Sequence, residues 1–539
     1  MSSRRHQGTH WQVLVVFALL LPGCMVGPDF TRPPAKVSPS WMDASDARLK
    51  TEPPEYRNWW RVFDDPVLEQ LIAQAYQENL SLKIAGVRVL EARAQLGIAA
   101  GGLYPQTQQA YGSLQYNRTS EQSPQAGALP AGQGAVNPAR SPLLSYWQSQ
   151  IGLSASWEID FWGKFRRATE SANANWLVSI ANYDSALISL TASVANSYVL
   201  IRTLEKRLEI ARQNVETQKE NLKIAEARFQ YGTASQLDVE QARTVLYNTL
   251  ASIPVLETQL QQAKDAVSVL LGLPPTDLPN LLKGASEIPV SPAQVVVGIP
   301  ADLLRRRPDI RSAEQQAAAQ CAQIGVAKAD LYPAFSLTGN FGFLSSDVGN
   351  FKLSDMFEWR SRMAQTGPSF QWNILNYGRI TNNVRVQDAR FQELLLSYQN
   401  AVLVAQQDVQ DNLTAFLRAQ DRAGFLAQSV EAAKKSLDLA VLQYREGTLD
   451  FTTVLVAQQA LLNEQDNLAS TLGSVSSSLV GVYRALGGGW EVREGKDVVP
   501  PEIREEMGKR THWGKLLAPA SYYPPASEEP ESTIRLPDW

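Results

Sequence analysis

The chain has 539 residues, of which 19% are charged, and its formal net charge at pH 7 is −4. This balance contains no basic excess that would favour nucleic acid as a partner. Three histidines and two cysteines are too few for a Cys/His metal site or a disulfide framework, and they supply little of the side-chain chemistry that most enzymes use. We therefore expect no metal, no cofactor and no enzymatic activity.

The N-terminus has the features of a secretory signal. Two arginines precede a short apolar run at 11–21, which is typical of a signal peptide rather than of a membrane helix. The residues 21–24, Leu-Pro-Gly-Cys, resemble a bacterial lipobox. This resemblance predicts a signal peptide over 1–23 and an N-acyl and S-diacylglycerol lipid on Cys24, and Met25 after the cysteine favours the outer membrane. An ordinary secreted protein with an incidental cysteine is the alternative.

An extended segment and a helix are predicted next. Residues 24–65 are rich in Pro, Trp and Asp and favour an extended conformation. A helix is expected over 65–100, because Asp65 is a good N-cap residue and Pro66 suits the first helical turn.

Three stretches alternate apolar and polar residues with a period of two. They lie at 147–160, 335–343 and 370–374, and a similar polar and aromatic stretch begins at Tyr104. Alternation of this kind predicts strands with one apolar and one polar face. We expect four strands in two hairpins, and an exposed loop at 120–142, which is rich in Gly, Ala, Pro and Gln.

A very long helix is predicted after each hairpin. Residues 164–231 contain no Gly or Pro, and residues 379–446 contain only Gly424. At about 1.5 Å per residue, each helix would be about 100 Å long. Helices of this length usually form coiled coils.

Each long helix is predicted to end in a tight turn and to be followed by a returning helix. The turns contain Gly232-Thr233 and Gly447-Thr448, where glycine suits a left-handed C-terminal cap. The first returning helix begins at Ser235, whose Ser-Gln-Leu-Asp sequence resembles a capping box. The second is expected to be capped by Asp450.

The chain contains the same unit twice. Residues such as Trp157, Gly232 and Leu271 recur 215 positions later without a gap, as Trp372, Gly447 and Leu486. A period this long indicates a duplicated unit rather than a solenoid. We divide the chain into an extended segment, two repeats that each comprise a helix, a hairpin and a long helix pair, and a Pro-rich, irregular tail, with the boundaries 24–65, 66–290, 291–490 and 491–539.

The strand count predicts an oligomer. A sheet can cross a membrane only when it is closed, because every backbone polar group in hydrocarbon must be paired. The smallest closed membrane barrels have about eight strands, so four per chain are too few. The predicted fold class is an α+β membrane protein, in which four strands per chain join those of other copies in a closed barrel that is continued by an α-helical coiled-coil tunnel; three copies would give a 12-stranded trimeric β-barrel.

Several sequence words resemble one family. Trp-Trp-Arg-Val-Phe-Asp-Asp-Pro-Val-Leu at 59–68, Ile-Pro-Ala-Asp-Leu-Leu-Arg-Arg-Arg-Pro-Asp-Ile at 299–310 and Tyr-Arg-Glu-Gly-Thr at 444–448 are similar to words in the TolC/OprM outer-membrane efflux channels, in their lipoprotein (NodT-like) branch. The resemblance implies a homotrimer in the outer membrane with its tunnel in the periplasm. It also implies a periplasmic adaptor (membrane fusion protein) and an inner-membrane pump, commonly of the resistance-nodulation-division class, for which the channel is a passive exit duct for drugs or solvents.

The resemblance places a gate at the helical tips. In the family an inner-coil tyrosine bonds an aspartate on the neighbouring outer coil, and Tyr444 and Asp238 match these positions. A purely structural role for Asp238, as the partner of Ser235 in the capping box, is an equally weighted alternative. The remaining predicted gate residues follow the tyrosine or lie in the first turns of the second returning helix: Arg445, Thr452, Thr453 and Val456.

One departure from the family affects ion selectivity. Members often have a ring of aspartates just after the second tip glycine, whereas Thr453 and Val456 occupy these positions here and Thr452 replaces a leucine. We therefore expect no acidic ring and only weak preference for cations.

Three further groups of residues receive structural interpretations. Arg305, Arg306 and Arg307 are predicted to be solvated residues before a helix. Cys321 is predicted to be a small buried residue. An aromatic belt at the membrane interface is predicted, with core packing as the alternative, for Trp147, Trp157 and Trp372.

Two other functions remain open at this level. A type I secretion duct would share the architecture but have a different partner. A lipid-anchored coiled-coil adaptor would need the long helices but not amphipathic hairpins. The sequence specifies neither the exported substrate nor the particular adaptor and pump.

Overall fold

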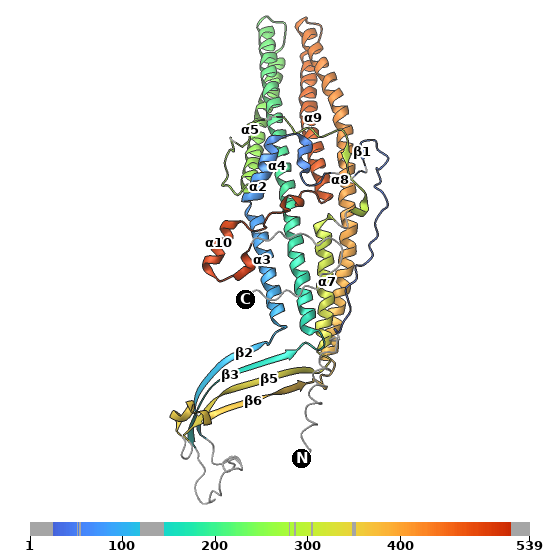
Figure 1. Ribbon diagram of the computed structural model, residues 1–539. Coiled ribbons are helices and arrows are strands. Elements are labelled where there is room, and N and C mark those ends of the chain that lie inside the picture. The colour runs from blue at the N-terminus through green and yellow to red at the C-terminus, as the bar shows by residue number, and fades with distance from the viewer. Residues whose placement is uncertain are drawn as a thin grey trace, which may run out of the picture.

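The computed structural model describes residues 25–50, 52, 55–118, 145–279, 281–284, 287–302, 306–347 and 352–518. The molecule is elongated, with a four-stranded sheet at one end and two helical hairpins at the other (Figure 1). The signal peptide, Cys24, the predicted loop at 120–142 and the end of the tail lie outside the described residues.

The sheet joins the two repeats. Its order is β2-β3-β5-β6 and all neighbours are antiparallel, so the predicted hairpin of each repeat is confirmed. The β3–β5 pairing between the repeats makes the sheet continuous. The four strands are β2 (Thr107–Arg118), β3 (Ser145–Ile159), β5 (Ala334–Ser346) and β6 (Arg362–Gln371).

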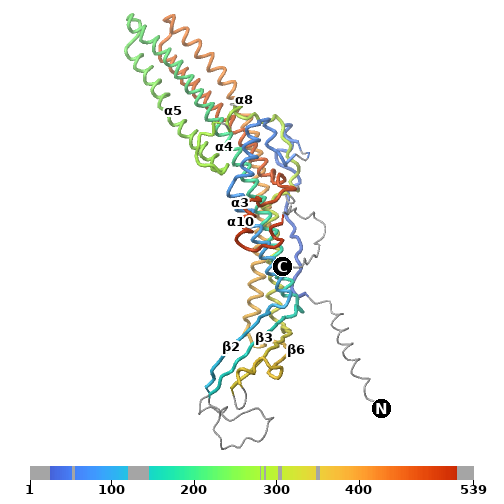
Figure 2. The backbone as a smooth tube through the Cα atoms, turned by 60° about the vertical axis from the view of Figure 1, so that its left-hand side comes forward, coloured from blue at the N-terminus to red at the C-terminus, as the bar shows by residue number. Residues whose placement is uncertain are grey.

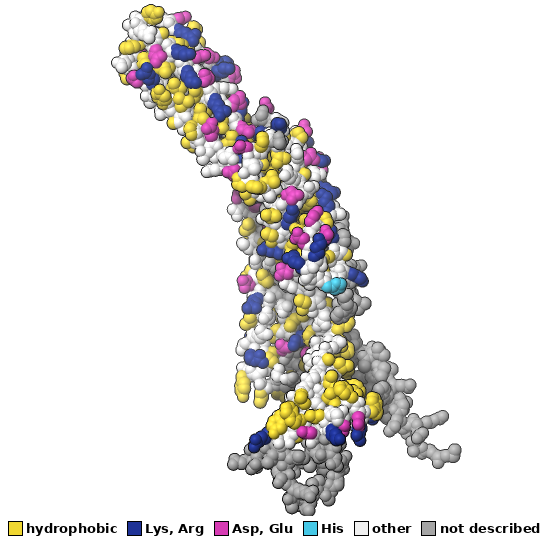
Figure 3. Space-filling model, turned by 90° about the vertical axis from the view of Figure 1, so that its left-hand side faces the viewer, with side chains coloured by type: hydrophobic (Ala, Val, Ile, Leu, Met, Phe, Trp, Pro, Cys, Tyr) yellow, Lys and Arg dark blue, Asp and Glu magenta, His cyan; other side chains and the backbone are white. Residues whose placement is uncertain are grey.

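One face of the sheet is apolar and exposed. Ile151 and Leu153 of β3 pair with Phe343 and Phe341 of β5, so their side chains form a continuous apolar surface. Leu153 is 62% exposed, and at one end of the surface the ring of Phe343 lies beside that of Phe357, which belongs to the 3-10 helix η4 (Leu353–Phe357). Figure 3 shows hydrophobic side chains gathered at this end, whereas charged side chains are spread along the helical part. A continuous apolar surface exposed in this way is usually covered by lipid or by another protein chain.

The strand predicted from the alternation at 370–374 ends earlier than expected. β6 ends at Gln371, so the prediction that Trp372 and Ile374 continue the strand is wrong. The indole of Trp372 instead donates a hydrogen bond to the carbonyl of Leu331, at 3.0 Å, where the preceding helix joins the sheet.

Four long helices form two antiparallel pairs, as predicted. The two 67-residue helices begin at Lys164 and Arg379, and Gly424 does not interrupt the second. An apolar stretch of the first is long enough to cross a membrane, but 72% of it is buried within the protein, which explains its composition. The four helices are α4 (Lys164–Gln230), α5 (Gln236–Leu270), α8 (Arg379–Arg445) and α9 (Phe451–Ala485).

Two shorter helices lie beside the long ones. α3 (Leu80–Gly101) packs on α4, and α7 (Pro308–Ala329) packs between α4 and α8. Figures 1 and 2 show α3, α4, α7 and α8 as one layer that continues from the sheet. The hairpin tips are inclined to the rest of the molecule. The main core lies at mid-length, where large side chains of α4, α8 and α9 are fully buried, including Tyr198, Tyr398, Phe416 and Leu479.

The single helix predicted over 65–100 is wrong. The chain forms α2 (Pro66–Glu78) and α3, separated by Asn79 in an extended conformation. The Asn79 side chain accepts a hydrogen bond from the Leu82 amide at 2.9 Å and donates one to the Leu270 carbonyl at 2.9 Å. The predicted Asp65 cap is confirmed, since its carboxylate accepts from the Val67 amide at 2.9 Å.

The prediction of solvated arginines before α7 is wrong for Arg306 and Arg307, whereas Arg305 lies outside the described residues. Arg306 pairs with Glu491 and lies over the ring of Tyr56. Arg307 pairs with Asp408 at 3.1 Å. Tertiary partners from distant parts of the chain therefore pair with these positive charges and cover them in part.

The tail after residue 490 is more regular than predicted. It contains the 3-10 helix η6 (Trp490–Arg493) and the helix α10 (Pro501–Arg510). Arg493 and Arg311 both pair with the carboxylate of Asp184, which is fully buried in α4. This ion-paired cluster fixes the start of the tail to the middle of the helical layer.

Residues 25–50, here called the N-terminal strap, run along the helices from the sheet end to mid-length. The strap is irregular, with turns at 42–48, and the rest of the segment predicted to be extended over 24–65 contains the 3-10 helix η1 (Trp59–Phe63), so the prediction of an extended conformation is wrong in these parts. The Val26 amide donates to the Trp162 carbonyl at 3.0 Å, and Arg32 binds Glu314 of α7 through two hydrogen bonds of 2.7 Å. At its far end, β1 (Leu49–Lys50) pairs in parallel with β4 (Val295–Val296).

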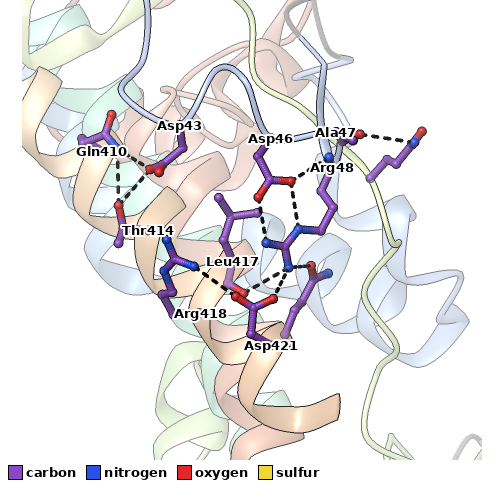
Figure 4. A network of polar contacts seen from close by, with 11 residues as sticks. Asp43, Asp46, Ala47, Arg48, Gln410, Thr414, Leu417, Arg418 and Asp421 are labelled. Carbon is purple, nitrogen blue, oxygen red and sulfur yellow. Dashed lines mark hydrogen bonds and ion pairs between the residues drawn. The ribbon is translucent and has the colours of Figure 1, made fainter. Parts of the chain in front are cut away.

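The strap is bound to one face of α8 (Figure 4). Side chains four residues apart on that helix, Gln406 and Gln410, accept hydrogen bonds from backbone amides of the strap at 2.8 and 3.0 Å. Further along, Arg48 donates to Asp421 at 2.8 Å and to Asp46. The Arg48 hydrogen bonds lower the pKa of Asp46 to about 2.

Candidate functional site

The tips of the two helical hairpins have the same turn geometry. In each, the glycine has positive φ, 72° for Gly232 and 80° for Gly447. The amide of the following threonine donates back to the long helix, Thr233 to Arg228 at 2.9 Å and Thr448 to Gln443 at 3.0 Å. These bonds define a Schellman C-cap, which satisfies carbonyls at the helix end and favours glycine at the left-handed position. Both repeats therefore turn at the predicted glycines.

The returning helices begin differently from one another. Ser235 and Asp238 form the predicted capping box, with hydrogen bonds of 3.2 and 3.3 Å between each side chain and the other residue's amide. Asp450 is at the N-cap position of α9, but its side chain makes no capping hydrogen bond, so the expectation that it caps the helix is correct in position only.

The tips have a small core of their own. It is separate from the main core and combines residues of both repeats. The rings of Tyr444 and Phe451 lie 5.0 Å apart within it. Because few residues are buried there, the tips are joined by less apolar contact than the middle of the molecule. The buried members are Ala225, Val239, Ala242, Leu437, Ala440, Tyr444, Phe451, Val454, Ala457 and Leu461.

Tyr444 occupies an unusual position in this core. Its side chain is 4% exposed, and its hydroxyl is buried without a hydrogen-bond partner in the described part of the chain. Burial raises its pKa, the charge of Arg228 opposes this effect, and the charge of Asp238 adds to it. Asp238 thus lies near enough to act on Tyr444 electrostatically, but within one chain the predicted hydrogen bond between them is not formed.

The other predicted gate residues are exposed. Thr452, Thr453 and Val456 lie on one face of the first turns of α9, and Val456 is 65% exposed. Their side chains are hydroxyl or apolar, and this face carries no carboxylate in that stretch. Arg445, at the end of α8, is also exposed.

Arg228 was missed by the sequence analysis. It lies in the last turn of α4, and its guanidinium donates to the backbone carbonyl of Tyr444 in the other repeat. Its Cζ lies 4.4 Å from the centre of the Tyr444 ring, and Nη2 donates to the Thr233 carbonyl at 3.3 Å. The available signal was the repeat itself, because the matching residue of the second copy is Gln443.

The remaining residues singled out in the sequence, Cys321 and three tryptophans, lie away from the tips, and the aromatic belt stays a prediction. Cys321 is 1% exposed, as expected, and burial raises its pKa to about 11. Trp157 donates to the carbonyl of Leu103 at 3.2 Å, which matches the bond from Trp372 to Leu331 in the other repeat. Both bonds fix the junction between helix and sheet. Trp147 lies near the opposite end of the sheet beside Tyr116.

No cluster of three or more His, Cys, Asp or Glu side chains suited to a metal ion occurs within the described ranges. The polar residues at the tips are held by helix caps, by a cation–ring contact and by backbone carbonyls. This arrangement can hold helices together and release them, but it provides no nucleophile beside a general base.

Comparison with known proteins identifies relatives over most of the chain. The profile of the family described as "Outer membrane efflux protein" matches residues 71–273 and 299–488. The chain is 31% identical to "Nodulation protein T" of Rhizobium leguminosarum bv. viciae over 475 residues, covering 88% of this chain and 92% of that protein. It is 30% identical to "Toluene efflux pump outer membrane protein TtgC" of Pseudomonas putida, covering 90% of this chain and 96% of that protein.

Two solved structures with similar sequences have the same fold. The outer-membrane channel OprN superposes with a TM-score of 0.79 at 30% identity, covering 87% of this chain and all of that one. The channel CmeC of Campylobacter jejuni superposes with a TM-score of 0.75 at 25% identity, over 91% of this chain and 99% of that one.

Proposed function

Because this chain belongs to the outer membrane efflux protein family, we propose that three copies of it form one channel-tunnel across the outer membrane and into the periplasm. The chain is the outer-membrane channel of an efflux system and not an enzyme.

The observation that carries the proposal is the open, uncovered sheet. The outer edges of β2 and β6 have no strand partner among the described residues, and the apolar face is exposed. Unpaired edges and an apolar face are unstable together in water, and unpaired backbone groups are also costly in lipid. Pairing β2 of one copy with β6 of the next removes both edges, and three copies give the proposed twelve-stranded barrel.

The long helices support the same assembly. The layer of α3, α4, α7 and α8 continues from the sheet, so closing the sheet also closes the helices into a tunnel below it. We assign the lipid to Cys24, which would attach the N-terminal strap to the membrane beside the barrel. The tunnel would then dock on a periplasmic adaptor and an inner-membrane pump, which we propose to be of the resistance-nodulation-division class.

The exported substrates are inferred from the descriptions of related proteins. Proteins with similar sequences are described as toluene, antibiotic and solvent efflux components. Small apolar or amphipathic compounds are therefore the proposed exported substrates. The tips would close the periplasmic entrance, with the Tyr444 hydroxyl bonding Asp238 of the neighbouring outer coil and Thr452, Thr453 and Val456 narrowing the pore. Arg445 is placed at the rim of this entrance.

The decisive experiment is reconstitution of the purified protein. We expect a trimer by mass measurement in detergent and discrete conductance steps in a planar lipid bilayer. A lipid-anchored coiled-coil adaptor would give no conductance under any applied voltage. A stable monomer or dimer that conducts would contradict the twelve-stranded barrel while leaving the channel function in place.

A further inference from the structure

We propose that Arg228 is an intrachain latch that holds the two helical tips of one protomer together and must release before the entrance opens. This inference rests on the proposed channel function and adds a positioning residue to its gate. It concerns the Tyr444 carbonyl and ring, and it is distinct from the proposed bond between the Tyr444 hydroxyl and Asp238.

The contact joins the two repeats at their extreme ends. Arg228 belongs to the α4–α5 hairpin, whereas Tyr444 belongs to the α8–α9 hairpin. The guanidinium donates to the Tyr444 carbonyl, covers the Tyr444 ring at 4.4 Å and donates to the Thr233 carbonyl at 3.3 Å. One planar side chain therefore connects both tips by polar and ring contacts, a geometry suited to arginine and not to lysine.

The electrostatic setting favours this cation. Both acceptor carbonyls lie at or just beyond the C-terminal end of a long helix, where the partial charge of the helix dipole is negative. The Tyr444 carbonyl also accepts the Gly447 amide at 3.0 Å, so the latch acts on the turn that caps α8. Releasing Arg228 should therefore loosen the second tip as well as separate it from the first.

The contacts of Arg228 are also readily released, because its partners are uncharged. In the described part of the chain, no carboxylate forms an ion pair with Arg228, so it is bound only by carbonyls, a hydroxyl and an aromatic ring. Arg243, on the same hairpin, is instead paired with Glu226 and Glu240 at 3.1 Å, and all three belong to one repeat. The arginine that crosses between the repeats has the more readily exchanged partners. The second copy has Gln443 at the matching position, so the sequence offers no second arginine for the reciprocal contact.

The matched variants are Arg228→Gln, Arg228→Lys and Arg243→Gln. Arg228→Gln introduces the side chain that the second repeat has at this position. In planar bilayers we expect it to raise the open probability of the resting channel by about tenfold, the factor expected for loss of one charged hydrogen bond. Arg228→Lys should behave like Arg228→Gln, because it retains the charge but not the fork. Arg243→Gln should stay within about twofold of the parent, since it disrupts only exposed pairs within one hairpin.

Hydrogen exchange provides a readout that does not require conduction. The amides of Gly447 and Thr448 should exchange faster in Arg228→Gln and be unchanged in Arg243→Gln. Unchanged exchange in Arg228→Gln would show that the contact does not hold the tips and would overturn the latch. Faster exchange with an unaltered open probability would overturn its role in gating. A parent protein that never conducts would refute the proposed function instead, while the exchange result would still decide whether Arg228 joins the tips.

Discussion

At the tips, Asp238 has two roles that the sequence alone does not distinguish. Asp238 closes a capping box with Ser235, and its charge also acts on the buried Tyr444. A substitution to alanine would remove both effects and could not distinguish them. Asp238→Asn keeps an acceptor for the Ser235 amide and removes only the charge.

We expect Asp238→Asn and Tyr444→Phe to raise passive entry of a large antibiotic into a pump-deficient strain. A shielded bond between a phenol and a carboxylate contributes about 1.5–3 kcal/mol, so its loss should increase leak by about tenfold or more. Tyr444→Phe keeps the ring that contacts Arg228 and Phe451, so it tests the hydroxyl alone. Parental leak in both variants would exclude a phenol–carboxylate bond at the entrance.

The cysteines permit a direct test of the lipid assignment. Cys321 is buried and its raised pKa keeps the thiol protonated at neutral pH, so it should not react with a thiol reagent at pH 8 in the folded protein. In denaturant we expect one reactive thiol per chain, because the proposed diacylglycerol would occupy the other cysteine. Two reactive thiols would refute acylation of Cys24, and mass measurement of the N-terminal peptide provides the control.

The buried carboxylate of Asp184 should be the most sensitive ionic position. Asp184→Asn removes the anion that pairs with Arg311 and Arg493, and uncompensated buried charge costs about 3–5 kcal/mol of unfolding free energy. Asp466→Asn, which breaks a half-exposed pair with Arg207, should cost less than about 1 kcal/mol. Denaturant unfolding followed by circular dichroism compares the two. Equal losses would show that the cluster is not what fixes the tail.

Among the elements, the N-terminal strap depends on one arginine at its far end. Arg48→Ala removes hydrogen bonds to Asp46, Asp421 and the Leu417 carbonyl, so we expect faster proteolytic cleavage of the strap with an unchanged fold. Lys50→Ala, on the neighbouring exposed position, is the control. Equal cleavage of both variants would show that backbone pairing alone secures the strap.

The same network has a defined response to pH. Because the folded-state pKa of Asp46 is lowered to about 2, its contribution is fully present above the unfolded value near 4 and is lost as the pH falls through about 2. Cleavage of the strap should therefore be as slow at pH 4.5 as at pH 7.5 when followed with a protease active at both. Acceleration already at pH 4.5 would assign the pH-sensitive step to another group.

Local signals in the sequence predicted the elements well. Long helices, glycine caps and alternating strands depend on neighbouring residues, and the two 67-residue helices agree with the prediction to within a residue at either end. Tertiary contacts explain the failures. Asn79 divides the first helix through a bond to Leu270, and Arg306 pairs with the distant Glu491. Arg228 was missed because its partner is in the other repeat.

At the scale of the whole molecule, the uncharged side chains proposed to line the entrance should determine ion selectivity. The exposed face formed by Thr452, Thr453 and Val456 carries no charge, so nothing there would bind cations strongly. We expect hexaamminecobalt(III) added on the periplasmic side of a bilayer to reduce conductance only slightly at millimolar concentration. Thr453→Asp should create block by adding three carboxylates around the pore. Strong block of the parent channel would contradict the assignment of these residues.

The contact between Val26 and Trp162 has a consequence for assembly. It holds the start of the strap at the junction of helix and sheet, so a lipid on Cys24 would enter the leaflet beside the barrel rim. Such a tether would add little to the contacts within the proposed trimer. It would instead confine newly exported chains to a surface and raise their effective concentration for one another. Loss of the lipid should therefore slow trimer formation at low expression while leaving the conductance of assembled channels unchanged.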